Sequence, residues 1–218
     1  MKRILVLLSL ACAVFSLSAQ TLERVTPESV GMDAQRLSNA DAAIEQAIQK
    51  KNIPGAVLAV VRHGKMAYIK AYGNKRVDPK NEPMTIETVF DMASCSKAMS
   101  TAVCTMTLIE QGKIRLQDRV SDYIPGYEGW TDEKGNKTAI RIIDLLTHTS
   151  GLPAYADANM LKEKYGAPNR DGLIDYIAHC KRNFKPGTDM TYSCLNFITL
   201  QRIIETVSGD DLRTYAHK

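Results

Sequence analysis

A serine and a lysine three positions apart, Ser94 and Lys97, lie at the start of an apolar stretch whose spacing predicts a helix. On a helix, positions i and i+3 share a face and differ by roughly 4.5 Å of rise, so the ammonium can reach the hydroxyl. A serine hydroxyl needs a base to become a nucleophile, and a lysine can be that base if burial or nearby charge lowers its pKa. We therefore expect Ser94 as nucleophile and Lys97 as its activator.

The helix start would add a second element of this chemistry. Backbone N–H groups at a helix N-terminus have no intrahelical acceptor and lie at the positive end of the helix dipole. The N–H of Ser94 could therefore be one of two donors to an acyl oxyanion. A serine and lysine at this spacing also occur by chance in many helices, so the pair alone does not decide the function.

A second set of reactive residues lies at Asp144, His148 and Ser150, which supply the three residue types of a serine protease triad. Triads are usually assembled from separate parts of a fold, whereas these residues share one short helix and the turn after it. We interpret His148 and Ser150 as residues that hydrogen-bond that turn. His179 and His217 have no metal-ligand spacing, so neither a metal nor another cofactor is expected.

The elements that position these residues follow from apolar periodicity and turn residues. A helix capped by Asp33 is predicted over 33–51, followed by a β-hairpin over 56–61 and 66–73 whose first strand is well buried. A loop over 74–88 leads to the helix that begins at Ser94 and ends before Gly112, which should be buried. Turns and loops are predicted over 113–137. Further helices are predicted over 138–146, 171–183 with Asp171 as cap, and 196–208, closed by Gly209.

One hairpin followed mostly by helices is an incomplete inventory for a closed domain, because a lone hairpin is marginally stable. Three motifs explain it: residues 90–97 (FDMASCSK), 145–153 (LLTHTSGLP) and 186–194 (PGTDMTYSC). In this order they resemble the serine β-lactamase-like superfamily, in its branch of class C β-lactamases, D-alanyl-D-alanine carboxypeptidases and esterases. The resemblance implies a β-lactamase/transpeptidase-like α/β (α+β) fold, with an antiparallel sheet flanked by helices and a helical subdomain.

The resemblance also implies roles for individual residues. Ser94 matches the acylated serine and Lys97 the lysine beside it, and Tyr192 matches the tyrosine of the Tyr-x-Asn motif that relays protons. A phenol can do this only with a cation close by, and Lys97 is one candidate. Cys194 stands where the family usually has the substrate-binding Asn, and a thiol is a weaker hydrogen-bonding group.

A further departure concerns the Lys-Thr-Gly or His-x-Gly motif, which normally lies far beyond the tyrosine, whereas this sequence ends at Lys218. We therefore expect the C-terminal sheet strands to be missing from this chain. The predicted organisation is a signal peptide at 1–19 and a serine hydrolase domain over 20–218 that is truncated at its C-terminus. On this interpretation the fragment alone would be poorly active or inactive.

Export is predicted by Lys2 and Arg3, the apolar run from Ile4 to Leu17 and the small residue Ala19. The location would be periplasmic or secreted, with no stable membrane span after signal removal. Without Lys2 and Arg3 the formal charge falls from +4 to +2 with no basic cluster, which argues against nucleic acid as a partner. Cys95, Cys104, Cys180 and Cys194 are expected as buried free thiols, although Cys180 to Cys194 or Cys95 to Cys194 bridges are conceivable.

Together these patterns predict an exported serine hydrolase that acts by acyl transfer without a cofactor. The substrate would be a small molecule or derived from peptidoglycan: a β-lactam, a D-alanyl peptide or an ester. Cys194 mildly favours an ester. One alternative is a penicillin-binding or cell-wall-sensing module that stays acylated, and another is a catalytically silent relative.

Overall fold

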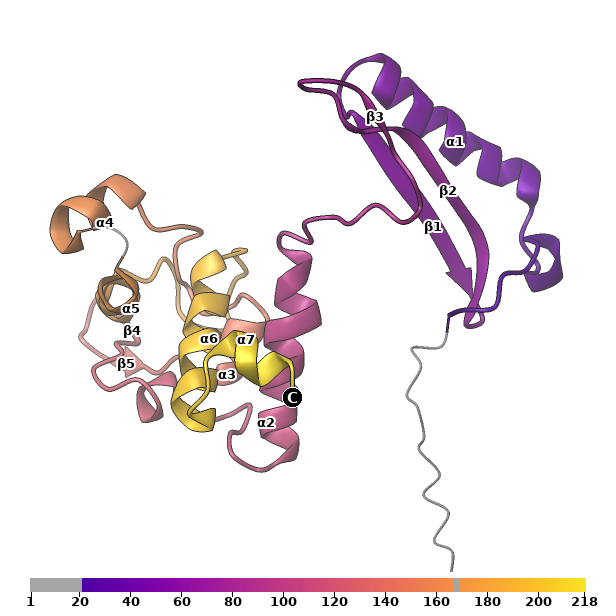
Figure 1. Ribbon diagram of the computed structural model, residues 1–218. Helices are drawn as coiled ribbons and strands as arrows, with labels where there is room; N and C mark the ends of the chain where they lie inside the picture. The colour runs from indigo at the N-terminus through magenta and orange to yellow at the C-terminus, as the bar shows by residue number, and fades with distance from the viewer. Residues whose placement is uncertain (1–20, 167–168) are drawn as a thin grey trace, which may run out of the picture. The chain divides into compact units, whose positions relative to one another are not determined.

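The computed structural model describes residues 21–166 and 169–218, so the expected signal peptide, residues 1–19, lies outside the described residues. The chain divides into two compact units, one ending at Phe90 and one comprising Asp91–Lys218. Figure 1 shows the first unit in indigo to purple and the second from magenta to yellow. Within the described ranges, no helix combines the length and apolar character needed to cross a membrane.

The first unit is built from an antiparallel sheet in the order β1-β2-β3 and the helix α1 (Figure 1). Its elements are η1 (Glu28–Val30), α1 (Ala34–Gln49), β1 (Gly55–Arg62), β2 (Lys65–Arg76) and β3 (Glu82–Pro83). Asp33 caps α1 as predicted, since its carboxylate accepts the backbone N–H groups of Gln35 and Arg36. The hairpin turn at His63 and Gly64 has positive φ at both positions, as a two-residue turn between twisted strands requires.

A polar cluster fixes α1 to β2. The hydroxyls of Tyr68 and Tyr72 donate to Asp41 Oδ1 at 2.6 and 2.5 Å, and Lys70 Nζ donates to Asp41 Oδ2 at 3.0 Å. These hydrogen bonds from Tyr68, Tyr72 and Lys70 lower the pKa of Asp41 to about 2. The carboxylate therefore stays ionised at neutral pH and holds three side chains of one strand.

Two predictions for this unit need correction. The first strand is half-buried to exposed rather than well buried, and Val61 is 50% exposed. Among the described residues of this unit, α1 is the one long helix, and it packs on β2 at one face of the sheet (Figure 1). The segment 74–88 is also not wholly a loop, because β2 continues to Arg76 and pairs with β3.

The second unit is organised around α6 (Cys194–Ser208). The helices α2 (Val103–Glu110), α3 (Ile142–Leu146), α5 (Arg170–His179) and α7 (Leu212–Ala216) all contact α6, and Figure 1 shows them gathered around it. The fully buried apolar side chains of this core include Leu108, Val120, Ile142, Leu145, Ile177, Leu200, Ile203 and Ile204. Because α6 directly follows Tyr192, this packing also anchors the segment that carries the tyrosine.

The predicted helices of this unit are present, with different ends. Gly209 closes α6 with φ of 79°, as predicted. The cap of α5 is Asn169 rather than Asp171, because Asn169 Oδ1 accepts the N–H of Gly172, and α5 ends at His179 rather than at 183. The sequence pattern did not indicate α4 (Ala158–Tyr165), η3 (Val120–Asp122) or the small hairpin of β4 (Trp130–Thr131) and β5 (Lys137–Thr138).

The helix that begins near Ser94 is not regular. Its first part, η2 (Lys97–Ala102), is a π-helix, and α2 continues from it to a left-handed Gly112. A π-turn bonds i to i+5, so it rotates the residues that follow relative to an unbroken α-helix. The buried face consists of Thr101, Cys104, Thr105 and Leu108. Met106, which an α-helical pattern places on the buried face, is exposed.

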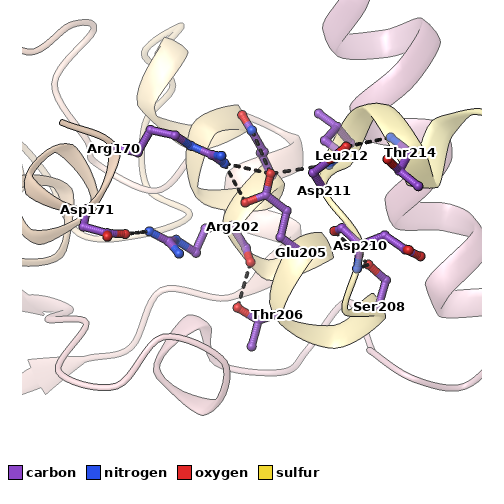
Figure 2. Close-up of polar contacts among 11 residues, drawn as sticks. Arg170, Asp171, Arg202, Glu205, Thr206, Ser208, Asp210, Asp211, Leu212 and Thr214 are labelled. Atoms are coloured by element: carbon purple, nitrogen blue, oxygen red, sulfur yellow. Dashed lines mark hydrogen bonds and ion pairs between the residues drawn. The ribbon is translucent and has the colours of Figure 1, made fainter. Parts of the chain in front are cut away.

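Glu205 joins three helices of this unit, as Figure 2 shows. Both of its carboxylate oxygens accept from Arg170 Nη2 at 2.8 and 2.7 Å, and Gln201 Nε2 donates to it at 3.0 Å. The backbone N–H of Leu212 points to the same carboxylate at 3.4 Å. Glu205 therefore holds α5 and α7 against α6, and its side chain is only 15% exposed.

Candidate active site

Ser94 and Lys97 meet at the N-terminal end of η2. Lys97 Nζ donates to Ser94 Oγ at 3.1 Å, so the predicted pair is in contact. Ser94 follows a sharp turn in which Ala93 has φ of 42° and donates its N–H to Asp91 Oδ1 at 2.8 Å. A positive φ is strained for a residue with a Cβ, and this strain sets the exposed serine at the head of the helix.

The backbone N–H of Ser94 is available for a substrate. The N–H groups of the next three residues, Cys95, Ser96 and Lys97, donate to the carbonyls of Met92, Ala93 and Ser94. Within the described ranges, the N–H of Ser94 itself donates to no protein acceptor. It therefore has the position and the free hydrogen expected of an oxyanion donor.

Tyr192 reaches the pair from the segment before α6. Lys97 Nζ lies 5.3 Å from the centroid of the Tyr192 ring, and the tyrosine is 44% exposed. Interactions with the Ser94 hydroxyl and the Lys97 ammonium lower the pKa of the Tyr192 phenol. The three predicted residues are therefore brought together, and the cation expected beside the phenol is Lys97.

The charge state of Lys97 differs from the expectation. Burial lowers the pKa of Lys97, but interactions with Tyr192 and Cys194 outweigh burial, and the pKa lies above its ordinary value. Lys97 thus remains an ammonium at neutral pH, whereas the phenol beside it is biased towards phenolate. The condition for Lys97 to act as the base, a pKa lowered by burial or nearby charge, is therefore not met, because its neighbours stabilise the charged form.

Cys194 is the first residue of α6 and lies near Lys97, since it contributes to the raised pKa of the ammonium. Its backbone N–H donates to the carbonyl of Ala154 at 3.1 Å. Its thiol favours the charged form of Lys97. Cys194 and Cys180 are half-buried free thiols and Cys104 is a buried one, whereas Cys95 is exposed, contrary to the expectation of burial.

His148 and Ser150 do more than close a turn. Ser150 Oγ accepts the N–H of Leu152 at 3.2 Å within the turn, as predicted, but it also donates to Asn196 Oδ1 at 2.5 Å in α6. The His148 ring lies 4.5 Å from the Tyr192 ring, centroid to centroid. No spacing rule indicates these contacts, because they join residues more than 40 positions apart in the sequence.

The partners of Asp144 differ from those of a triad. Its Oδ2 accepts the N–H of Arg141 at 2.8 Å, and Thr149 Oγ1 donates to its Oδ1 at 3.3 Å. His148 Nδ1 instead contacts the backbone N–H of Ser193 and the side-chain amide of Asn196 in α6. The geometry therefore favours the site at Ser94 over one at Ser150.

Comparison with known proteins places this geometry in a family. The sequence model of the beta-lactamase family matches residues 40–218. An N-acetylmuramyl-L-alanine amidase of Bacillus subtilis is 32% identical over 206 residues, which cover 89% of this chain and 46% of the amidase.

Solved structures of hydrolases resemble this chain in fold as well. EstCE1, a hydrolase with promiscuous acyltransferase activity, has a TM-score of 0.71 at 28% identity, over 88% of this chain and 50% of that chain. A class C β-lactamase in complex with cefoxitin has a TM-score of 0.65 at 28% identity, over 82% of this chain and 46% of that chain.

The chain thus spans about half the length of the relatives it matches. Its described elements are those of a β-lactamase/transpeptidase-like α+β fold and cover part of such a domain. The matched residues include all three motifs, those around Ser94, His148 and Tyr192. This chain belongs to the beta-lactamase family.

Proposed function

We propose that this protein is an exported serine hydrolase in which Ser94 is acylated by a β-lactam, a D-alanyl peptide or an ester. The observation that carries the proposal is the contact of Lys97 Nζ with Ser94 Oγ at 3.1 Å, with the Tyr192 phenol beside both. Membership of the beta-lactamase family supports hydrolysis in general, and the residues at Ser94 support acyl transfer.

The lowered pKa of Tyr192 and the raised pKa of Lys97 favour Tyr192 as the base, with the Lys97 ammonium stabilising its phenolate form. As Ser94 Oγ attacks the carbonyl carbon of the substrate, its proton passes to the Tyr192 phenolate, and the carbonyl oxygen gains the negative charge. The Ser94 N–H then donates to that oxyanion. When the acyl–leaving-group bond breaks, the Tyr192 phenol returns the proton to the leaving group. Water resolves the acyl-enzyme by the same proton transfers, and Ser94 is restored.

The cellular side of the proposal rests on two supports. The first 19 residues carry the charged, apolar and small-residue regions of a secretory signal. A relative from Bacillus subtilis is named as an N-acetylmuramyl-L-alanine amidase, and its name points to a cell-wall substrate. A periplasmic or secreted enzyme that meets peptidoglycan-derived or small acyl donors fits both supports, with no nucleic acid as partner.

Cys194 favours one alternative. A thiol near Lys97 is a poorer hydrogen-bonding group than the amide usual in the family, so it would orient substrate and water less well. If deacylation suffers most, the protein acts as a penicillin-binding or cell-wall-sensing module that stays acylated. If acylation fails as well, it is a catalytically silent relative.

Intact-mass measurement after incubation with a fluorophosphonate and, separately, with a penicillin tests the proposal. The longest natural form of the protein is compared with Ser94→Ala and with Ser96→Ala, which removes an exposed serine two residues away. We expect a fluorophosphonate adduct on the wild type and on Ser96→Ala, and none on Ser94→Ala.

The two reagents separate the alternatives. A penicillin adduct that disappears within minutes supports a hydrolase, whereas one that persists supports the binding module. A wild-type protein that gains neither adduct refutes Ser94 as a nucleophile and leaves the silent relative.

A further inference from the structure

A buried hydrogen-bond chain runs from the turn after α3 to α6. Ser150 Oγ donates to Asn196 Oδ1 at 2.5 Å, and Asn196 Nδ2 lies 3.0 Å from His148 Nδ1. Ser150 and Asn196 both have 0% exposure. Polar groups this deep must be paired, because an unpaired buried donor or acceptor destabilises the fold.

Two backbone N–H groups fix the donor and the acceptor of each hydrogen bond that links Ser150, Asn196 and His148. The N–H of Leu152 donates to Ser150 Oγ at 3.2 Å, which leaves the Ser150 hydroxyl proton for Asn196 Oδ1. At the other end, the N–H of Ser193 donates to His148 Nδ1 at 3.2 Å. A backbone N–H cannot accept, so His148 Nδ1 must be the acceptor, and Asn196 must present its NH₂ group to it.

His148 is therefore neutral, with its proton on Nε2. A protonated imidazole carries hydrogen on both nitrogens and could accept from neither Ser193 nor Asn196. The residue also has φ of 60°, a left-handed conformation that turns its carbonyl towards the segment of Tyr192.

The contacts of His148 enclose Tyr192 from both sides along the chain. The N–H of Thr191 donates to the carbonyl oxygen of His148 at 3.1 Å, and the N–H of Ser193 donates to the ring. The imidazole also packs on the Tyr192 phenol ring at 4.5 Å between ring centroids. Its second aromatic neighbour is Phe197, at 5.3 Å between ring centroids. The residues before and after Tyr192 are thus both bound to one histidine.

We propose that His148 is a positioning residue that, in its neutral form, holds the Tyr192 phenol at Ser94, and that protonation of His148 in acid releases the phenol and slows acylation. The proposal rests on the proposed function of Ser94 and adds its regulation by pH. His148 acts through Tyr192 and needs no contact with substrate.

The groups around the imidazole of His148 determine the pH range in which it becomes protonated. Lys97 of η2 is the charged group that acts on the imidazole, and the titratable phenol of Tyr192 packs against it at 4.5 Å between centroids. From α6, the uncharged Asn196 and Phe197 contact the ring. Burial and then the Lys97 ammonium lower the pKa of His148. The neutral form therefore prevails at neutral pH. The hold of His148 on the Tyr192 segment, here called the clamp, weakens as the pH falls below the ordinary histidine pKa of about 6.5.

Two substitutions of His148 test the clamp, with the rate of fluorophosphonate labelling of Ser94 measured against pH. His148→Asn keeps an acceptor at the position of Nδ1, tolerates the left-handed backbone and cannot titrate. We expect its neutral-pH rate within about threefold of wild type, with the histidine step missing from the acid limb. His148→Ala removes the acceptor of both hydrogen bonds, so we expect fluorophosphonate to label Ser94 about tenfold more slowly or slower still.

Phe197→Leu is the matched control, because it removes the other ring in contact with His148 and leaves both Nδ1 hydrogen bonds. It should keep the wild-type acid limb. If His148→Asn labels as slowly as His148→Ala, or keeps the wild-type acid limb, the proposal is wrong. Should His148→Ala fail to fold, the pH profile of His148→Asn decides.

Nitrogen-15 NMR of the imidazoles separates this proposal from the proposed function. The His148→Asn spectrum assigns the His148 signals by their loss. A proton on Nε2 in the wild type at neutral pH supports the clamp even if Ser94 is never labelled, a result that refutes the proposed function alone. A proton on Nδ1 overturns the clamp whatever Ser94 does.

Discussion

Arg182 is a buried cation whose partners are mostly carbonyls. It is 5% exposed, and within the described ranges no carboxylate pairs with it. Its Nη2 donates to the carbonyls of Glu128 and Ala178 at 2.7 and 2.9 Å. Its Nη1 donates to the carbonyl and the thiol of Cys180, and the guanidinium lies over the Tyr127 ring at 5.2 Å. The side chain thus fastens the end of α5 to the segment before β4.

Arg182→Met should lower the free energy of unfolding by about 3 kcal/mol. The carbonyl of Ala178 keeps a donor, because the N–H of Glu128 also binds it at 2.9 Å. The carbonyls of Glu128 and Cys180 lose theirs, at about 1 kcal/mol each for partly buried acceptors. The lost contact with the Tyr127 ring adds about 1 kcal/mol, and methionine retains most of the apolar packing.

Arg182→Lys separates geometry from charge. An ammonium on a single chain keeps the cation but cannot donate to both carbonyls from two nitrogens as the planar fork does. We expect a loss of about half that of Arg182→Met. Urea unfolding followed by the fluorescence of Trp130 measures both variants, because Trp130 is the one tryptophan in the sequence and shares a cavity wall with Arg182.

Either of two results would refute this reasoning. A loss below about 1 kcal/mol in Arg182→Met would mean that the carbonyls find other donors or water at no cost. A lysine variant as stable as the wild type would mean that the forked shape of the guanidinium is irrelevant.

Two further predictions concern stability. Gly151→Ala places a Cβ in steric overlap with the carbonyl oxygen of Phe184 at φ of 78°, so we expect it to lower the melting temperature clearly more than Gly135→Ala, where φ is 84° and nothing lies within 4 Å; equal shifts would contradict the contact. Burial raises the pKa of Glu205, but hydrogen bonds from Gln201, Arg170 and the Leu212 N–H outweigh burial and lower it. Its contribution to stability is therefore present above the unfolded value of about 4.3 and lost as the pH falls further. Glu205→Gln should cost about 1–2 kcal/mol at pH 7 and progressively less in acid, as measured by urea unfolding at several pH values; a pH-independent difference would show that charge plays no part.

Much of the candidate site could be predicted because it depends on local spacing and on motif order. The contact between Ser94 and Lys97 follows from a separation of three positions at a helix start, and Tyr192 comes with its motif. The capped ends at Asp33 and Gly209 were also readable, because a side-chain oxygen or a left-handed glycine terminates a helix through local hydrogen bonds.

The remainder depends on contacts between distant parts of the chain. His148 meets Ser193 and Asn196 only because α3 packs on α6, which no local pattern encodes. The raised pKa of Lys97 depends on where Tyr192 and Cys194 come to lie around it, whereas the sequence-based expectation considered only burial and charge in general. Short elements such as β4 and β5, of two residues each, are too brief to show periodicity.

The π-helix η2 makes chain length part of the site. One residue corresponds to about 100° of rotation in an α-helix, so a wider turn between Lys97 and Ala102 offsets the two ends of the helix against each other. If that stretch were one residue shorter and regularly α-helical, either Ser94 and Lys97 would keep their place beside Tyr192 or Leu108 would keep its place in the core. Both could not hold at once. The extra residue of the π-helix, rather than any particular side chain, thus allows Ser94 to face Tyr192 while Leu108 stays in the core.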